Sequence, residues 1–227
     1  RQRLGADRAD GQPRVERGMG EVSDIFRARV LERLAGNSAI GHTRYSTAGS
    51  SVIANAQPIV VKTSMGPLGL VHNGNLANGV ELRRRLEKEG SIFQTTSDSE
   101  VILHLMARSP RSEIVESFML ALEEVRGAYS LLAVTDDGLL AARDPQGLRP
   151  LLLGWHEGNP CFASETFAFD LLDAEADREL EPGEVVLARR GKVDSFRLPP
   201  SGEPARCLFA HVYCARPDSP ILGDSVS

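Results

Sequence analysis

The order of helical and strand patterns along the chain predicts an α+β domain built in layers. Short apolar runs dominate the first part of the 227 residues, three helical patterns follow, and short apolar runs return after Gly127 with one more helical pattern among them. Strands and helices segregated in this way are typical of α+β proteins, whereas a doubly wound parallel sheet needs strict alternation of the two. A layered α+β domain is therefore the expected fold class.

The first part of the chain is expected to supply a short helix and three strands. Residues up to about Gly20 are rich in turn-forming types, and residues 22–34 have the spacing of a short helix. Apolar runs that fit strands lie at residues 39–45, 59–61 and 68–72. The last run is followed by Asn73-Gly74-Asn75, a sequence that strongly favours a turn.

Three helices are expected next. The first spans residues 77–89 and ends at Gly90, where glycine commonly terminates a helix. The second follows residues 95–98, which are all types that favour the N-cap position. The third spans residues 111–124, whose apolar side chains recur at helical spacing.

The last part of the chain changes to short strands. Apolar runs lie at residues 129–134, 138–143, 150–155 and 161–164, and a helix is expected at residues 166–174. Two further strands, at residues 185–189 and 192–196, are joined by Arg190-Gly191 and predict a β-hairpin. Residues 199–204 are the best linker candidate, and one more apolar segment follows at residues 207–213.

The composition excludes several classes of protein. Hydrophobic residues make up 41% and charged residues 25% of the chain, as in ordinary soluble globular proteins. A net charge of −5 without a long basic run disfavours nucleic acid as a partner. No apolar stretch reaches the roughly twenty residues of a membrane span, and three cysteines form no disulfide framework. We therefore expect a cytoplasmic protein that binds neither nucleic acid nor membranes.

An arginine and two hydroxyl side chains stand where the strand at residues 39–45 is expected to end. These are Arg44, Ser46 and Thr47. A guanidinium group at this position can hold a carboxylate through two parallel hydrogen bonds. The alternative is an arginine paired with a nearby acid for purely structural reasons.

Asn73 and Gly74 combine an amide side chain with the backbone N–H of a glycine. Donors of this kind suit an oxyanion hole, where they face negative charge that develops in the transition state. The alternative is an ordinary Asn-Gly turn between a strand and a helix.

Asp98 opens the second expected helix. Its carboxylate is suited to bind a substrate ammonium group, or it simply complements the helix dipole in the first turn. Residues 144–150 are interpreted as a tight turn between strands. Taken together, Arg44, Asp98 and the Asn73-Gly74 pair describe a pocket for an amino acid whose side chain is attacked. No serine, cysteine or threonine has a convincing partner base, although Cys207 or Cys214 is close in sequence to His211.

Six motifs, in order and with compatible spacing, resemble the glutaminase domain of the glutamine phosphoribosylpyrophosphate amidotransferases. They lie at residues 41–51, 72–76, 96–100, 144–150, 163–166 and 181–184. The resemblance extends over residues 17–227. Related glutaminases share the arginine and Asn-Gly motifs, but Tyr45-Ser46-Thr47-Ala48-Gly49 and residues 215–219 point to the purine enzymes.

The resemblance implies an N-terminal-nucleophile hydrolase fold, a four-layer α/β/β/α sandwich. In that family a cysteine at the mature N-terminus attacks the glutamine amide, with its own α-amine as the base. By position, Arg44 is expected to bind the α-carboxylate of glutamine, with Thr47 nearby, and Asp98 to bind the α-amino group. The side chain of Asn73 and the backbone N–H of Gly74 are expected to form the oxyanion hole.

The resemblance also implies a partner domain and a second substrate. Ammonia would pass to a phosphoribosyltransferase domain and react with phosphoribosylpyrophosphate to give phosphoribosylamine in purine biosynthesis. Residues 1–206 are assigned to the glutaminase domain, and residues 207–227 to its last segment and the start of the transferase domain. A full-length enzyme of this kind is expected to be a homo-oligomer. Mg²⁺ is expected only for the transferase domain.

The sequence departs from the family at its beginning. The nucleophilic cysteine and the first strand of the sandwich are expected upstream of Arg1, and residues 1–16 match the family poorly. These 227 residues alone are therefore expected to be inactive. No cofactor is expected; Cys207 lies near a ligand position of the iron–sulfur cluster that some members carry, but a cluster is not predicted. The alternative is a non-catalytic glutamine-binding or interaction module of the same fold.

Overall fold

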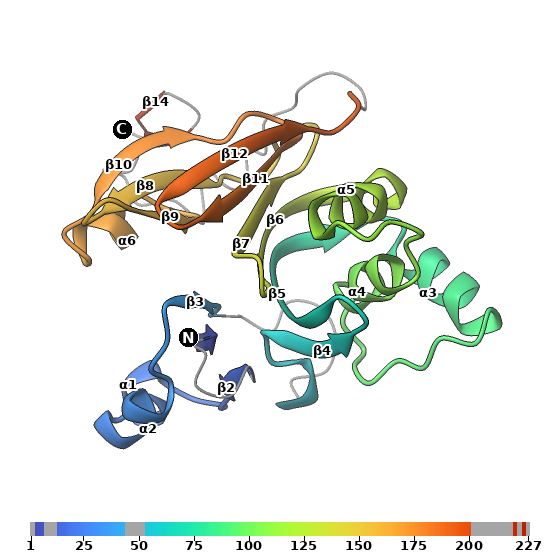
Figure 1. Cartoon of the computed structure of the whole chain (residues 1–227), viewed down its shortest axis with the longest axis horizontal. Helices are drawn as coiled ribbons and strands as arrows, with labels where there is room; N and C mark the ends of the chain where they lie inside the picture. Colours follow the sequence, from blue (N-terminus) through green and yellow to red (C-terminus); the bar gives the residue numbers. More distant parts are fainter. Residues whose placement is uncertain (1–2, 7–12, 44–52, 201–219, 222–223, 226–227) are drawn as a thin grey trace. The chain divides into compact units, whose positions relative to one another are not determined.

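The computed structural model describes residues 3–6, 13–43, 53–200, 220–221 and 224–225. The chain divides into two compact units. The first unit comprises residues 1–72, 76–126 and 132–139, and the second comprises residues 73–75, 127–131 and 140–227. Figure 1 labels most of the helices and strands.

The sheet with the most strands in the described part of the chain has six, hydrogen-bonded in the order β12-β11-β7-β6-β5-β4. In chain order these strands are β4 (Ile59–Thr63), β5 (Gly66–Leu76), β6 (Gly127–Val134), β7 (Leu139–Arg143), β11 (Glu184–Arg189) and β12 (Lys192–Arg197). The β4–β5 and β11–β12 pairs are antiparallel hairpins. Arg190 and Gly191, with φ of 49° and 71°, form the two-residue turn of the second hairpin, as the sequence predicts.

The start of the first unit differs from the prediction. Two strands, β1 (Arg3–Ala6) and β2 (Arg14–Glu16), lie in the stretch that the sequence predicts to be rich in turns. They form an antiparallel sheet with β3 (Ser38–Gly41) in the order β2-β1-β3. The single helix expected at residues 22–34 is two short helices, α1 (Val22–Ile25) and α2 (Ala28–Arg33). None of their residues is buried, so packing does not hold them together as one helix.

Three helices of the first unit form its main helical layer (Figure 1). They are α3 (Gly79–Lys88), α4 (Glu100–Ala107) and α5 (Ile114–Glu124), as predicted, and α4 packs against both of the others. Buried apolar side chains such as Leu86 and Phe118 stabilise this packing by roughly 1.5–3 kcal/mol each. No helix in the described part of the chain is long and apolar enough to cross a membrane.

The end of α3 shows how its sequence sets its length. Gly90 has a φ of +94°, which favours glycine. Its N–H donates to the carbonyl of Glu87 at 3.0 Å, and the N–H of Ser91 donates to the carbonyl of Leu86 at 2.9 Å. This pair of bonds is a Schellman motif, which satisfies the last carbonyls of the helix.

Strand β5 corrects one prediction. Asn73-Gly74-Asn75 is not a turn, because β5 continues through these residues to Leu76, and the turn follows at Ala77-Asn78. Side chains from other segments hold the backbone of His72 and Leu76, on either side of these residues, as described below. These contacts outweigh the local preference of an Asn-Gly pair for a turn.

The second unit contains a three-stranded sheet in the order β10-β8-β9. Its strands are β8 (Leu152–His156), β9 (Asn159–Ala163) and β10 (Glu175–Glu179), and the short helix α6 (Phe167–Asp170) lies between β9 and β10 in the chain. Strand β10 was not predicted, because it is an exposed edge strand of mostly charged residues with no apolar alternation. The remaining short elements are η1 (Ile53–Asn55) in the first unit, and β13 (Pro220–Ile221) and β14 (Asp224–Ser225), which pair with each other.

Candidate active site

Asp98 ties the loop before α4 to the end of strand β5. Its Oδ2 atom accepts the backbone N–H of Leu76 at 2.8 Å. Its Oδ1 atom lies 3.3 Å from the hydroxyl of Ser99 and 3.7 Å from Nδ1 of His72. The side chain of Asp98 is 31% exposed, and a carboxylate has about four acceptor sites. Part of its acceptor capacity is therefore open to a ligand.

The surroundings of Asp98 keep it ionised. Burial raises the pKa of this carboxyl, but the hydrogen bond and charge of His72, the N–H of Leu76 and the hydroxyl of Ser99 together outweigh burial and lower the pKa below 3.8. Asp98 is thus a carboxylate at neutral pH. A partly exposed carboxylate of this kind is a suitable acceptor for an ammonium group.

Asp98 does not cap helix α4. The N-cap residue of α4 is Ser99, and no side chain makes a capping hydrogen bond there. The carboxylate of Asp98 instead bonds to β5, a segment distant in the sequence. Its role in this structure is therefore different from that of the helix-capping acid considered from the sequence.

A buried glutamate shapes the loop that carries Asp98. Oε1 of Glu100 accepts the N–H of Gln94 at 2.8 Å, and Oε2 accepts the N–H and the hydroxyl of Thr95 at 2.8 and 2.7 Å. Arg83 of α3 donates to the carbonyl of Thr95 at 2.7 Å. Because Glu100 is only 2% exposed, these charge-assisted bonds are well shielded from water. The loop is thus fixed from α3 and from α4.

Asn73 and Gly74 lie next to each other in strand β5 and are both half-buried. The side-chain nitrogen of Asn73 donates to the hydroxyl of Ser164 at 3.3 Å, which orients the amide and uses one of its two N–H groups. Gly74 has a φ of +155°. Asn73 and Gly74 are the hydrogen-bond donors expected from the sequence, and both lie in strand β5. Their role as an oxyanion hole stays a prediction.

Several residues singled out from the sequence lie outside the described part of the chain. They are Arg44, Ser46, Thr47, Cys207, His211 and Cys214. The expected binding roles of Arg44 and Thr47 therefore stay predictions. The same holds for the two cysteines.

Cys161 is the cysteine for which the structure describes the surroundings. It lies half-buried in β9, and burial raises the pKa of its thiol. A thiol in that state is largely protonated at neutral pH and is a poor nucleophile. Cys161 does not have the properties of a catalytic cysteine.

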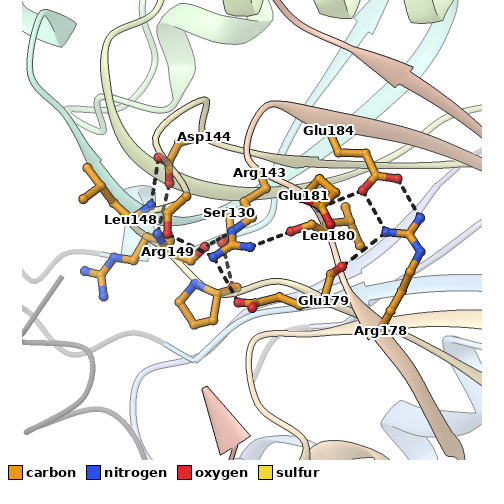
Figure 2. A network of polar contacts seen from close by, with 12 residues as sticks. Ser130, Arg143, Asp144, Leu148, Arg149, Arg178, Glu179, Leu180, Glu181 and Glu184 are labelled. Carbon is orange, nitrogen blue, oxygen red and sulfur yellow. Dashed lines mark hydrogen bonds and ion pairs between the residues drawn. The ribbon is translucent and has the colours of Figure 1, made fainter. Parts of the chain in front are cut away.

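The turn at residues 144–150 is structural, as predicted (Figure 2). Asp144 is fully buried, and its two oxygens accept the backbone N–H groups of Gln146, Leu148, Arg149 and Tyr129 at 3.0–3.3 Å. A single carboxylate therefore replaces the hydrogen bonds that a regular strand would supply to this segment.

Two arginines complete the network in Figure 2. Arg143 is buried, donates to the carbonyls of Arg149, Leu180 and Gly147, and pairs with Glu179 at 3.0 Å. Arg178 makes a bidentate pair with Glu184 at 2.6 and 2.8 Å. Every one of these partners is a backbone or side-chain group of the same unit, so this network stabilises the second unit.

Sequence reasoning missed two buried amides, Asn55 and Gln57, which hold the backbone near the candidate site. Asn55 bonds to Thr96, two residues before Asp98, and Gln57 bonds to both backbone groups of His72. The available signal was the pair of amides in an otherwise small and apolar segment that ends at Pro58.

The comparisons with known proteins agree with the family resemblance of the sequence motifs. The family model described as "Glutamine amidotransferase domain" matches residues 42–171. Amidophosphoribosyltransferase 2, chloroplastic, of Arabidopsis thaliana is 47% identical over 210 residues, which are 92% of this chain and 37% of that protein. The amidophosphoribosyltransferase of Methanocaldococcus jannaschii is 42% identical over 92% of this chain and 48% of that protein. The chain thus spans less than half the length of these relatives.

Solved structures confirm the fold class. Glutamine phosphoribosylpyrophosphate amidotransferase from Bacillus subtilis, complexed with ADP and GMP, has a TM-score of 0.91 and 36% identity over 99% of this chain and 48% of that chain. A class-II glutamine aminotransferase domain protein from Silicibacter pomeroyi, with a TM-score of 0.58 and 16% identity, shares the fold alone. The predicted α+β fold of the N-terminal-nucleophile type is therefore confirmed. Because the family model matches more than half of the 227 residues, the chain belongs to the glutamine amidotransferase domain family.

Proposed function

We propose that this chain is the glutaminase part of an amidophosphoribosyltransferase, which binds glutamine and releases ammonia from its side-chain amide. The observation that carries the proposal is the ionised, partly exposed carboxylate of Asp98, which accepts the N–H of Leu76 and faces His72. The family and the similarity to amidophosphoribosyltransferases support it.

Each proposed site residue has one task. Asp98 accepts the α-ammonium group of glutamine, and Arg44, with Thr47 nearby, holds the α-carboxylate through its guanidinium group. Two charged anchors on the α-carbon leave the side-chain amide of glutamine as the reacting group. The amide of Asn73 and the N–H of Gly74 donate to the oxygen that becomes negatively charged when the amide carbon is attacked.

The attacking group in the proposal is an N-terminal cysteine of the family type. The α-amine takes the thiol proton as the sulfur adds to the amide carbon, and it returns this proton to the nitrogen as the C–N bond breaks and ammonia leaves. Water then hydrolyses the thioester to glutamate and restores the thiol. Cys161 does not fit this task, because burial raises the pKa of its thiol. A polypeptide of these 227 residues is therefore expected to bind glutamine without turning it over.

The ammonia has a proposed use in the whole protein. It reacts with phosphoribosylpyrophosphate on a phosphoribosyltransferase domain to give phosphoribosylamine in purine biosynthesis. The length of the relatives supports this proposal, because more than half of each of them extends beyond the part that matches this chain.

The proposal is tested by titrating the 227-residue polypeptide with L-glutamine in a calorimeter, with L-asparagine as the comparison ligand. We expect glutamine to bind, and asparagine to bind less tightly because its side chain is shorter by one methylene group. Arg44→Ala is expected to weaken glutamine binding by about tenfold or more. An ammonia assay on the same sample is expected to give no glutamine-dependent signal. Failure of glutamine to bind at millimolar concentration overturns the proposal.

A further inference from the structure

Gln57 continues the β4–β5 ladder with its side chain. The two strands pair Ile59 with Leu70 and Thr63 with Gly66, and the same register places Gln57 opposite His72. There the side-chain amide of Gln57 makes the hydrogen bonds that a strand backbone would make. Its Nε2 donates to the carbonyl of His72 at 3.0 Å, and its Oε1 accepts the N–H of His72 at 2.5 Å. Gln57 is 6% exposed, so both bonds are shielded from water.

Asn55, two residues earlier, holds the loop that carries Asp98. Its Oδ1 atom accepts the N–H of Thr96 at 2.9 Å, and its Nδ2 atom donates to the hydroxyl of Thr96 at 2.8 Å. Asn55 is 2% exposed. A buried amide that satisfies both of its functional atoms fixes the partner backbone, because any shift leaves a buried polar group unpaired.

The two amides hold two segments that both lead to the carboxylate of Asp98. Thr96 stands two residues before Asp98 in the loop, and His72 faces the Oδ1 atom of Asp98 from β5. Nδ1 of His72 also lies 2.8 Å from the hydroxyl of Ser99, the neighbour of Asp98. Asn55 and Gln57 therefore set the position of the loop and of the strand between which the carboxylate of Asp98 is held.

We propose that Asn55 and Gln57 are positioning residues that fix the carboxylate of Asp98 for the α-ammonium group of the substrate, and so make the site specific for an α-amino acid. This inference rests on the proposed function, in which Asp98 binds that group. Neither amide touches the substrate. Each acts by keeping Asp98 in the geometry that an ion pair with an ammonium group requires.

A merely structural role makes a different prediction. If the amides only stabilise the hairpin, their loss lowers stability and leaves the preference for an α-amino group unchanged. Thr63, at the other end of the same hairpin, offers a matched control, because its hydroxyl donates to the carbonyl of Gly66 at 3.0 Å and accepts the N–H of Met65 at 3.1 Å. Thr63→Val removes these two bonds far along the hairpin from His72.

The experiment compares two ligands, L-glutamine and glutaramic acid, which is glutamine without its α-amino group. Their affinities for the 227-residue polypeptide are measured by calorimetry, together with its thermal unfolding, for the unsubstituted chain and for Asn55→Leu, Gln57→Met and Thr63→Val. We expect the unsubstituted chain to prefer glutamine, and Asn55→Leu and Gln57→Met to reduce that preference by roughly tenfold, because an ion pair with the ammonium group depends on the position of the carboxylate. Thr63→Val is expected to keep the full preference.

Each outcome has a definite meaning. If the Asn55→Leu and Gln57→Met variants both fold and both keep the full preference for glutamine, the inference is overturned, while the proposed function stands. An unsubstituted chain that binds glutamine no better than glutaramic acid overturns the role of Asp98 and the inference with it. If Asn55→Leu does not fold, Asn55→Asp replaces it, because Asp keeps the acceptor for the N–H of Thr96 but lacks the donor, and the preference is again expected to fall.

Discussion

The carboxylate of Asp98 accepts the backbone N–H of Leu76 at 2.8 Å, so an acidic side chain in a loop is bonded to the last residue of strand β5. The bond crosses twenty-two positions of sequence. It leaves the other oxygen of Asp98 facing His72 and Ser99, with 31% of the side chain exposed. One carboxylate therefore joins two segments of the first unit and keeps acceptor capacity for a ligand.

The first residue of helix α3 limits the space around Asp98. A Cβ atom at Gly79 would lie 3.1 Å from Cβ of Asp98 and 3.3 Å from Cβ of Leu76. Gly79→Ala is therefore expected to displace Asp98 by a few tenths of an ångström and to weaken glutamine binding by roughly threefold to tenfold. The measurement is a calorimetric titration with glutamine.

Gly90 at the other end of α3 provides the control for that substitution. Its φ is +94° and, apart from its two chain neighbours, no residue has a heavy atom within 4 Å of a Cβ added there, so Gly90→Ala costs about 1 kcal/mol of backbone strain without crowding Asp98. Glutamine affinity is expected to stay unchanged in Gly90→Ala. Equal affinities in the two alanine variants would contradict the proposed position of the ligand beside Asp98.

Glu184 is expected to make the stability of the chain depend on pH. Burial raises the pKa of its carboxyl, but the bidentate bonds from Arg178, the N–H of Glu181 and the hydroxyl of Ser195 outweigh burial and lower the pKa below 4.5. A carboxyl whose pKa is lower in the folded state stabilises that state above the unfolded pKa, and the contribution is lost as the pH falls through the folded pKa. The stabilising effect of Glu184 is thus complete at pH 7 and declines below about pH 4.5.

The corresponding experiment is urea unfolding of the unsubstituted chain and of Glu184→Gln at pH 7 and at several values below pH 4.5. We expect Glu184→Gln to lower the free energy of unfolding by about 2 kcal/mol at pH 7, since hydrogen bonds to a charged group are lost. The difference is expected to shrink as the pH falls. Glu87→Gln, which affects an exposed pair with Arg83, serves as the control and should cost under about 0.5 kcal/mol. A difference for Glu184→Gln that does not change with pH would refute the linkage.

Arg143 is expected to be essential for the stability of the second unit. Its side chain is 3% exposed, and it bonds to three backbone carbonyls as well as to Glu179. Arg143→Met leaves these acceptors without their donor and should lower the free energy of unfolding by about 3–5 kcal/mol. Arg189→Met removes an exposed pair with Asp194 and should cost less than about 1 kcal/mol. Similar unfolding midpoints for the two methionine variants in urea would show that the buried network is not stabilising.

The sequence predicted the elements whose signals are local. The three helices α3, α4 and α5 have apolar residues at helical spacing, and their order between two groups of strands identified the α+β class. The hairpin at Arg190-Gly191 was predicted because a two-residue turn with positive φ has a strong residue preference. The turn at residues 144–150 was predicted from its Asp-Pro and Gly residues.

The failures have non-local causes. Asn73-Gly74-Asn75 has the composition of a turn, but Gln57 and Asp98 bond to the residues on either side of it and keep it in β5. No local sequence pattern indicates that a side-chain amide will replace the backbone groups of a neighbouring strand. Strand β10 consists mostly of charged residues, so no apolar pattern in the sequence indicates its pairing with β8. The site residues named from sequence motifs stay predictions, whereas the buried amides of Asn55 and Gln57 were not predicted at all.

The most direct test of the central claim is the affinity of the 227-residue polypeptide for glutamine and for glutaramic acid, measured by calorimetry before and after Asp98→Asn. Asparagine at this position keeps an oxygen that can accept the N–H of Leu76, but it carries no negative charge. If Asp98 binds the α-ammonium group, glutamine affinity falls by about tenfold or more while the affinity for glutaramic acid is unchanged. Equal losses for both ligands, or no loss for glutamine, would contradict the account.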